Sequence, residues 1–423
     1  IRDRQGINNQ IKKTNKKVVF ADGEDENTLK AAIAFKNSGL GTPILVAKEK
    51  VVKEKLREIG YGENFDIEIV NSTLSDKRKK YVNYFKVNSK KVKGKKVMLD
   101  TSPRVVLVQN VGMFSVGKDL SSAKIAGDLT ETNAKVISSV EETSTYKFIP
   151  EKDLFDVEYW SLEQAKIKKK KKLLEGNIVV ITGATGTIGF ETYKIFKNYV
   201  AEVILLDNDL NRLKEVQLKI KDLCIHCDVT NKKSVKRAFK IICEKFGGFD
   251  ILISNAGAAP GGAIGEVSDE VLRKSFEINF FSHQNCASEA IKIMKKQNIN
   301  GCLLFNISKQ SVNPGKNFGP YGLPKSALLS LCKQYAVDYG SIGIRSNGVN
   351  ADRIKSGLMT GKMIKTRAKA RSVSADTYMR GNLLSNEVKA EDVAKAFFHL
   401  AVSKKTTGAV LTVDGGNIAA SLR

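Results

Sequence analysis

The chain is predicted to contain an α/β domain built on a doubly wound parallel sheet, and three observations carry this prediction. From about residue 177, apolar strands alternate with helix-like stretches, a glycine-rich turn follows the first strand, and Asp207 ends the second. Parallel strands need crossover connections, which helices on both faces of a sheet supply. The pattern therefore indicates a fold of the Rossmann type. Its seven strands are expected at residues 177–182, 202–206, 223–227, 250–254, 301–307, 343–349 and 409–413.

The first half of the chain is interpreted as smaller, truncated α/β segments. A strand, helix, strand unit opens it, which indicates a second piece of parallel sheet. The main boundary is placed near residue 175, after a run of lysines at 168–172 that we interpret as a solvated linker. Strands are expected at 18–21, 43–47, 65–70 and 103–108, helices at 26–37, 50–59 and within 121–149, a strongly basic stretch at 75–97, and a partly apolar connection at 153–166.

Length and charge limit the classes of protein that the chain can be. Its 423 residues suit two or three domains, and no apolar run approaches the roughly 20 residues that cross a bilayer. The net charge of +25 comes from lysines spread along the chain, without the aromatic residues or motifs of a nucleic-acid site. We therefore expect a cytoplasmic protein that binds neither nucleic acid nor a membrane.

The six cysteines are expected to be free thiols, because their spacing suggests no disulfide framework. Cys224 and Cys227 form a C-x-x-C with His226 between them, a pattern that also occurs in metal sites. Here it lies in a strand that leads into Asp228, and no second ligand pair is evident. No metal is predicted.

The glycine-rich turn predicts a site for a dinucleotide. In "NIVVITGATGTIGFETYKIF" an apolar strand ends at Thr182, and a helix follows the turn. Gly183, Gly186 and Gly189 allow a tight turn, a close approach to a pyrophosphate and packing of the helix on the sheet. The helix N-terminus adds amides and a positive dipole, which suit a phosphate.

Asp207 predicts the choice of dinucleotide. It ends the second strand 18 residues after Gly189, where a carboxylate accepts hydrogen bonds from the adenosine ribose. The same carboxylate would repel a 2′-phosphate, so NAD is favoured over NADP. The alternative is that Asp207 only forms a turn before Asn208.

Tyr321 and Lys325 predict acid/base chemistry at the end of the fifth strand. Four residues apart, they share one face of a helix, and a cation beside the phenol is expected to lower its pKa. Pro324 is compatible with this helix if it lies in the first turn, where its missing N–H has no intrahelical partner.

From about residue 177 to its end, the chain resembles the short-chain dehydrogenase/reductase family. The glycine-rich turn, the "NAG" at 255–257, the Tyr321 segment and the terminal "TVDGG" at 412–416 carry the likeness. One departure is Thr187, at which ordinary members have glycine. The resemblance implies NAD as cofactor, bound by Thr182, Gly183, Gly186, Thr187, Ile188, Gly189, Asp207, Asp228, Val229, Asn255, Ala256, Gly257, Tyr321, Lys325 and Ile354.

The same resemblance implies four catalytic residues. Tyr321 is the acid/base, and Lys325 both tunes it and holds the nicotinamide ribose. Ser308, thirteen residues before Tyr321, steadies the substrate oxygen, with Ser311 as its rival. Asn279 holds a water in the proton relay, although an amide that kinks the helix is an alternative reading of this residue.

The segments "SKQSVNPGKNFGPYGLPKSA" and "NGVNADRIKSGL" resemble one subgroup, the bacterial bifunctional rhamnulose-1-phosphate aldolase/short-chain dehydrogenases. This likeness implies a sugar, a polyol or a small hydroxyaldehyde such as lactaldehyde as substrate. The segment from Asp352 to Met379 is expected to cover the substrate. Its many lysines and arginines suit either an anionic compound or a solvated lid.

Two other resemblances concern the first half. Residues 1–87 begin with a stretch similar to the start of a phosphate acetyltransferase domain, as found in malic enzymes, and residues 88–175 resemble the end of a class II aldolase domain. Because the first 175 residues contain no histidine, aldolase activity is not expected. Residues 176–423 form the dehydrogenase domain.

The sequence thus favours an NAD-dependent oxidoreductase acting on a small molecule, and the family resemblance implies a homo-oligomer. Two alternatives stay open. The first is an acyl- or aldol-transferring enzyme that works through the first half, and the second is a basic binding protein with a vestigial nucleotide fold.

Overall fold

The computed structural model shows a chain that divides into two compact units, Ile1–Lys172 and Leu173–Arg423. It describes residues 17–20, 26–37, 42–58, 67–70, 76–90, 96, 98–99, 104–108, 112–117, 120–160, 173–199, 202–298 and 300–417. Within these ranges, no helix combines the length and the apolar character that a membrane span requires.

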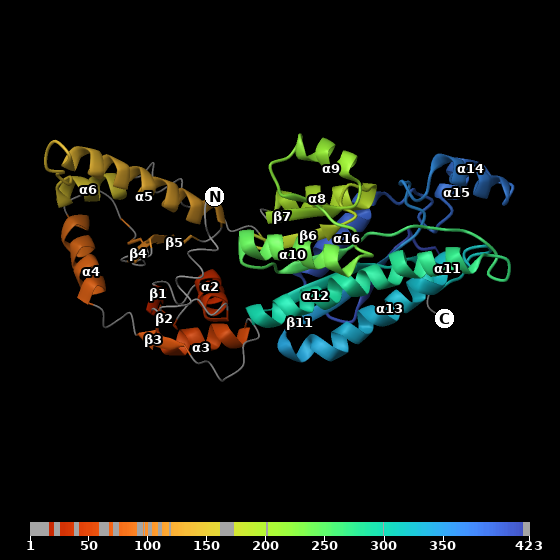
Figure 1. Ribbon diagram of the computed structural model, residues 1–423, viewed down its shortest axis with the longest axis horizontal. Helices are drawn as coiled ribbons and strands as arrows, with labels where there is room; N and C mark the ends of the chain where they lie inside the picture. The colour runs from red at the N-terminus through yellow and green to blue at the C-terminus, as the bar shows by residue number, and fades with distance from the viewer. Residues whose placement is uncertain are drawn as a thin grey trace. The chain divides into compact units, whose positions relative to one another are not determined.

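Seven strands of the second unit form one parallel sheet, in the order β12-β11-β10-β9-β6-β7-β8. Figure 1 labels three of these strands, β6, β7 and β11. The order reverses beside β6, since β7 lies on one side of it and β9 on the other. This confirms the predicted doubly wound fold, with strand ends within two residues of those expected. The strands are β6 (Ile178–Thr182), β7 (Glu202–Asp207), β8 (Cys224–His226), β9 (Ile251–Ser254), β10 (Gly301–Asn306), β11 (Ile344–Ala351) and β12 (Val410–Val413).

Helices cover both faces of this sheet, and each face has its own core. On one face, α8 and α16 contribute Phe196 and Phe397, both fully buried. On the other face, α10, α12 and α13 contribute side chains such as Phe239, Ala287 and Leu328. The helices are α8 (Thr187–Asn198), α9 (Leu210–Gln217), α10 (Lys232–Phe246), α11 (Asp269–Phe276), α12 (Ser282–Gln297), α13 (Gly319–Tyr339), α14 (Gly361–Lys369), α15 (Ala375–Met379) and α16 (Ala390–Val402), with the π-helix η2 (Glu277–Phe281) and the 3₁₀ turns η3 (Lys309–Ser311) and η4 (Gly340–Ile342).

The position of Pro324 differs from the expectation. Helix α13 begins at Gly319, so Pro324 lies inside the helix and Pro320 occupies the first turn. The prediction was wrong because the helix starts earlier: the amides of Tyr321 and Gly322 already donate to the carbonyl of Phe318. The helix still tolerates a proline at this position, since the backbone hydrogen bond that Pro324 removes is one of many in a helix of 21 residues.

The first unit contains a parallel sheet in the order β1-β2-β3 and an antiparallel hairpin of β4 and β5. The expected strands and helices up to residue 70 are present, and β5 and two further helices were not foreseen. Helix α4 lies in the basic stretch 75–97, for which the sequence predicted no helix or strand, and α6 overlaps the connection expected at 153–166. The linker at 168–172 lies outside the described residues. The elements are β1 (Lys17–Phe20), α2 (Glu26–Asn37), β2 (Thr42–Val46), α3 (Glu49–Glu58), β3 (Glu68–Val70), α4 (Asp76–Ser89), β4 (Val105–Val108), β5 (Gly112–Ser115), α5 (Leu120–Glu141) and α6 (Glu151–Glu158).

Candidate active site

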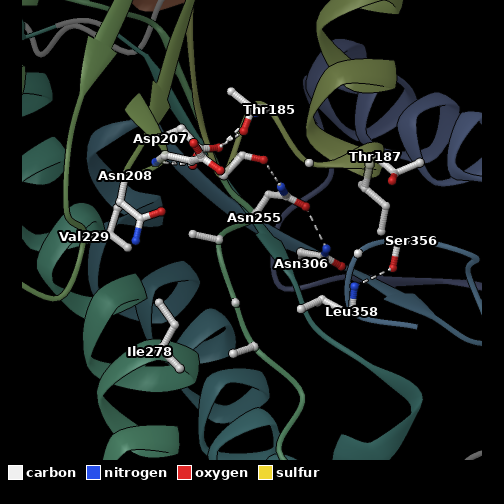
Figure 2. A pocket seen from close by; sticks show the side chains of 18 of the residues that line it. Thr185, Thr187, Asp207, Asn208, Val229, Asn255, Ile278, Asn306, Ser356 and Leu358 are labelled. Atoms are coloured by element: carbon white, nitrogen blue, oxygen red, sulfur yellow. Dashed lines mark hydrogen bonds between the residues drawn. The ribbon is translucent and has the colours of Figure 1, made fainter. Parts of the chain in front are cut away.

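A pocket of about 570 Å³ lies at the carboxyl ends of β6, β7, β9 and β10 (Figure 2). This is the edge at which doubly wound sheets bind their ligands, and the volume falls in the usual range of roughly 300–1,000 Å³. Nine of the residues predicted to bind a cofactor line it. They are Gly183, Gly186, Thr187, Ile188, Asp207, Val229, Asn255, Ala256 and Gly257.

The glycine-rich turn has the geometry that a pyrophosphate requires. Gly183 has a φ of +60°, and a Cβ added there would lie 2.9 Å from the Cα of Ala256. A Cβ on Gly189 would collide with the carbonyl oxygen of Gly183, so this glycine lets α8 pack against the turn. Within the described chain no side chain caps α8 at Gly186, which leaves its first amides available to a phosphate.

Thr187 fits this site in spite of its departure from the family pattern. It is the first residue of α8, its side chain is exposed, and it lines the pocket. A side chain at this position therefore points into the open pocket and collides with no neighbouring backbone.

Asp207 is held in place by the glycine-rich turn itself. The amide and the hydroxyl of Thr185 donate to its Oδ2 at 2.9 and 2.8 Å, and the amide of Asp209 donates to its Oδ1 at 3.2 Å. Asp207 is also nearly buried at the pocket wall. The carboxylate is therefore a fixed acceptor at the position where the sequence placed the adenosine ribose.

A chain of hydrogen bonds joins the ends of three strands under the pocket floor. The hydroxyl of Thr182 accepts from the amides of Asn255 and Ala256, and the Asn255 side chain donates to the carbonyls of Thr182 and Gly183. Asn306 donates to Oδ1 of Asn255 at 2.8 Å (Figure 2). Thr182 thus shapes the pocket from below and is not part of its lining.

The other six predicted cofactor residues do not line the pocket; they are Thr182, Gly189, Asp228, Tyr321, Lys325 and Ile354. Oδ1 of Asp228 accepts hydrogen bonds from the amide and hydroxyl of Thr230, so this carboxylate closes a local turn. Ile354 is buried in the core with Val349 and Val388. The pocket is instead closed beyond β11 by Ser356, Gly357 and Leu358.

Tyr321 and Lys325 lie on one face of α13, as predicted from their spacing. The Lys325 nitrogen is 5.8 Å from the centre of the Tyr321 ring and donates to the carbonyl of Asn306 at 2.7 Å. Because Asn306 lines the pocket, this bond links Lys325, and with it the helix face that carries Tyr321, to the pocket wall.

The charges of this pair differ from the expectation. Removal from water raises the pKa of Tyr321, the hydroxyl of Ser308 lowers it in part, and the charge of Asp352 raises it further. Burial also lowers the pKa of Lys325 to about 7. Among the residues that the structure describes, Lys325 is not one of the groups that shift the pKa of Tyr321, so the lowering of the phenol pKa that we expected from this lysine is not found.

The two candidate serines have different surroundings. The hydroxyl of Ser308 accepts from the amide of Gln310 at 3.2 Å and acts on the phenol of Tyr321, whose pKa it lowers. The hydroxyl of Ser311 donates instead to the carbonyl of Ser308 at 2.6 Å. Of the two candidate serines, Ser308 is therefore the one that acts on the Tyr321 phenol.

Asn279 is fully buried in the π-helix η2, one of the short π segments that frequently occur at functional sites. Its Oδ1 accepts from the amide of Ala258 at 3.1 Å, and its Nδ2 donates to Ser275 at 3.0 Å. A Cβ on Gly257 would lie 3.0 Å from Asn279 Oδ1 and 3.8 Å from Lys325 Nζ, so both residues border the same small space.

Sequence reasoning missed several residues of the site. Thr185 and Asn306 line the pocket, and the available signals were the place of Thr185 in the glycine-rich turn and that of Asn306 at the end of β10. Lys309 and Asp352 form an ion pair of 3.2 Å beside Ser308, and Oδ2 of Asp352 also accepts from Asn417 at 2.7 Å. This pairing joins residues 43 positions apart, so no local pattern announces it.

Comparison with known proteins covers both units. Residues 183–417 match the model of the family described as Enoyl-(Acyl carrier protein) reductase, which is part of the short-chain dehydrogenase/reductases. Residues 42–167 match the model described as Aldolase class II, second domain. The aldolase match thus begins at residue 42, whereas the sequence analysis placed the start of the aldolase-like segment at residue 88.

Individual relatives agree with these models. The chain is 30% identical over 343 residues to the uncharacterized oxidoreductase YuxG of Bacillus subtilis (strain 168), an alignment that spans 77% of this chain and 50% of that protein. The chain thus spans about half the length of this relative.

Two solved structures resemble the second unit. The 3-ketoacyl-(acyl-carrier-protein) reductase from Brucella melitensis complexed with NADH is 25% identical, with a TM-score of 0.53, over 57% of this chain and 98% of that one. The aldohexose dehydrogenase of Thermoplasma acidophilum is 26% identical, with a TM-score of 0.50, over 57% and 93%.

Proposed function

The chain belongs to the short-chain dehydrogenase/reductase family, and from this premise we propose that it transfers a hydride between NAD(H) and a small hydroxyl or carbonyl compound. Tyr321 acts as the acid/base. The observation that carries this proposal is the position of Lys325, which donates to the carbonyl of the pocket residue Asn306 and lies 5.8 Å from the centre of the Tyr321 ring, while Ser308 acts on the pKa of that phenol. A vestigial nucleotide fold has no reason to keep these three groups together.

The residues of the chain divide the work as follows. Ser308 positions the substrate oxygen, and Tyr321 exchanges a proton with it, giving the proton to a carbonyl or taking it from an alcohol. Lys325 binds a ribose hydroxyl, and the side chain of Asn279 borders the same small space beside Gly257. The bound nicotinamide supplies or accepts the hydride. The chain itself contributes orientation and proton transfer.

We propose NAD as the cofactor because the Asp207 carboxylate is fixed at the ribose end of the pocket. A 2′-phosphate would meet a negative charge there, held by two hydrogen bonds from Thr185. Arg212 also lines the pocket, but its Nε lies 3.4 Å from Asp209, which offsets its charge. The NADH in the Brucella relative is consistent with this choice.

We propose a sugar, a polyol or a hydroxyaldehyde as the substrate. Lys309 directly follows Ser308, and its paired Asp352 acts on Tyr321, so an ammonium and a carboxylate lie near the reacting oxygen. Such groups suit the several hydroxyls of a polyol, and one of the similar structures is an aldohexose dehydrogenase.

The segment from Asp352 to Met379, which is expected to cover the substrate, gives less support to an anionic substrate. Arg353 donates to the carbonyls of Tyr378 and Gly381, and Arg367 stacks on the ring of Phe318 at 3.8 Å. These guanidinium groups are occupied by contacts within the segment and its surroundings, so we favour a neutral substrate.

For the first unit we propose no aldolase catalysis. Its sequence matches an aldolase model over residues 42–167, yet the three histidines of the chain, His226, His283 and His399, all lie in the second unit. Class II aldolases hold their metal with imidazoles, which this region lacks.

The proposed function is tested by following the absorbance of NADH with aldohexoses, polyols and short hydroxyaldehydes, in both directions. We expect turnover with at least one of these compounds and a strong preference for NAD(H). The variant Tyr321→Phe serves as the matched blank, and equal rates of variant and wild type would contradict the proposal.

A further inference from the structure

The active-site core contains a polar atom that the mechanism above leaves unused. Among the described residues, two buried side-chain atoms have no hydrogen-bond partner, and one of them is Nε2 of His283. His283 lies in α12, one turn after Asn279, and is fully buried. Its Nδ1 lies 2.7 Å from the hydroxyl of Ser254 at the end of β9. Because a buried polar atom without a partner is costly, this nitrogen points to a small polar ligand.

The surroundings of His283 connect it to the catalytic lysine. The ring lies over β10, with its centre 6.3 Å from that of Phe305, and Ser254 faces it from β9. From α13, the charge of Lys325 acts on the imidazole, and together with burial it holds the pKa of His283 well below the ordinary value. The imidazole is therefore neutral, and Lys325 is the group whose charge, after burial, lowers its pKa.

The Lys325 ammonium has more N–H groups than the single acceptor that it contacts in the part of the chain that the structure describes. Its ammonium carries three N–H groups, and one of them is accepted by the carbonyl of Asn306. The side chain is 3% exposed, so bulk water reaches it poorly. In the proposed function one donor serves the ribose, which leaves one donor without an assigned acceptor. The ammonium borders the same small space as Asn279, and His283 follows Asn279 by one helical turn.

We propose that His283 is a positioning residue for Lys325 and acts through one bound water molecule. Its Nδ1–H donates to Ser254, and its Nε2 lone pair accepts a hydrogen bond from a water whose oxygen accepts from the Lys325 ammonium. A lone pair, and not an N–H, faces this direction because the nearby charge is positive. The effect is to fix the ammonium beside Tyr321. This inference rests on the proposed function only for the role of Lys325.

The tautomer gives a test that needs no substrate. The full chain holds three histidines, so ¹⁵N NMR of the histidine-labelled protein resolves each ring, and His283→Asn assigns the signals. We expect His283 to be protonated at Nδ1 and unprotonated at Nε2 over the neutral pH range. Lys325→Met should shift the Nε2 signal, and Tyr321→Phe should leave it almost unchanged. A protonated Nε2, or no response to Lys325→Met, would overturn the proposal.

A pair of variants tests the function of the same nitrogen. The amide of His283→Asn reaches only the place of Nδ1, whereas the amide of His283→Gln extends to the place of Nε2. For oxidation of an aldohexose by NAD⁺, we expect His283→Asn to lower kcat about tenfold, the value of a lost hydrogen bond to a charged group. Its pH profile should be displaced, while the unfolding temperature should stay the same. His283→Gln should recover most of the rate.

The outcomes separate the two proposals. If His283→Asn keeps the wild-type kcat and pH profile while Tyr321→Phe is inactive, the role of His283 is wrong and the proposed function stands. If Tyr321→Phe remains active, the proposed function is wrong, and the NMR result still decides the tautomer. Should the His283 variants fail to fold, the wild-type tautomer and the response to Lys325→Met decide the proposal.

Discussion

The ammonium of Lys325 lies 5.8 Å from the centre of the Tyr321 ring and donates a 2.7 Å hydrogen bond to the carbonyl of Asn306. The lysine is thus placed by β10, at the edge of the cofactor pocket, as well as by its own helix. Its burial lowers its pKa to about 7, so its charge depends on what else binds beside it.

Tyr321→Phe should lower kcat by about 10² to 10⁴, the usual contribution of general acid/base catalysis. Phenylalanine keeps the volume of the ring and removes the group that exchanges the proton. NADH affinity, measured by fluorescence titration, should change little. A variant with more than roughly a tenth of the wild-type rate would show that another group is the acid/base.

Asp207→Ala should weaken NADH binding by roughly ten- to a hundredfold, because hydrogen bonds to the charged carboxylate are lost. NADPH should gain relative affinity, since the negative charge at the ribose end is gone and Arg212 remains at the pocket. Titration of both cofactors against wild type and variant checks this. An unchanged NADH/NADPH ratio would remove Asp207 from the cofactor site.

Asp352→Asn should move the pH profile of alcohol oxidation to lower pH. The charge of Asp352 raises the pKa of Tyr321, and the phenol must lose its proton to act as a base. Removing that charge makes deprotonation easier and also frees the cation of Lys309, which acts in the same direction. The profile of kcat/KM for wild type and variant measures the shift, and a move to higher pH would contradict the assignment.

Lys325→Met should abolish activity and yet raise the stability of the cofactor-free protein. A lysine with a folded pKa of about 7 and an unfolded pKa of about 10.4 is destabilising below pH 7, where both states are charged but only one is buried. This cost falls as the pH rises above 7. The gain in unfolding temperature should therefore be larger at pH 6 than at pH 9, and the opposite order would refute the burial argument.

A protein truncated to Leu173–Arg423 should bind NADH as the full chain does, because the pocket residues all lie in the second unit. Its turnover should also be retained. The measurements are NADH affinity and kcat of both lengths, after circular dichroism has shown that the shorter protein is folded. Normal binding with lost turnover would assign the first unit a part in catalysis.

The helices that sequence reasoning missed show where local patterns fail. The rings of Tyr84 and Phe85 in α4 pack against those of Phe155 and Tyr159, at 5.5 Å between Tyr84 and Phe155 and 5.2 Å between Phe85 and Tyr159. Both partners lie in stretches where lysines and acids dilute the apolar spacing. A helix whose stability comes from a partner 70 residues away has a weak signal in its own sequence.

The sequence by itself determined the sheet, the glycine-rich turn and the face shared by Tyr321 and Lys325. These features depend on spacing within one strand, one turn or one helix, which neighbouring residues control. Only the tertiary structure decided that Thr185 fixes Asp207, that Ser308 and not Ser311 acts on the Tyr321 phenol, that Asp352 raises the pKa of that phenol, and that the charge of Lys325 acts on His283. Each of these contacts, except the one between Ser308 and Tyr321, joins residues more than 20 positions apart. Such pairs are set by how helices pack on the sheet, and so by the volumes and charges of the whole core.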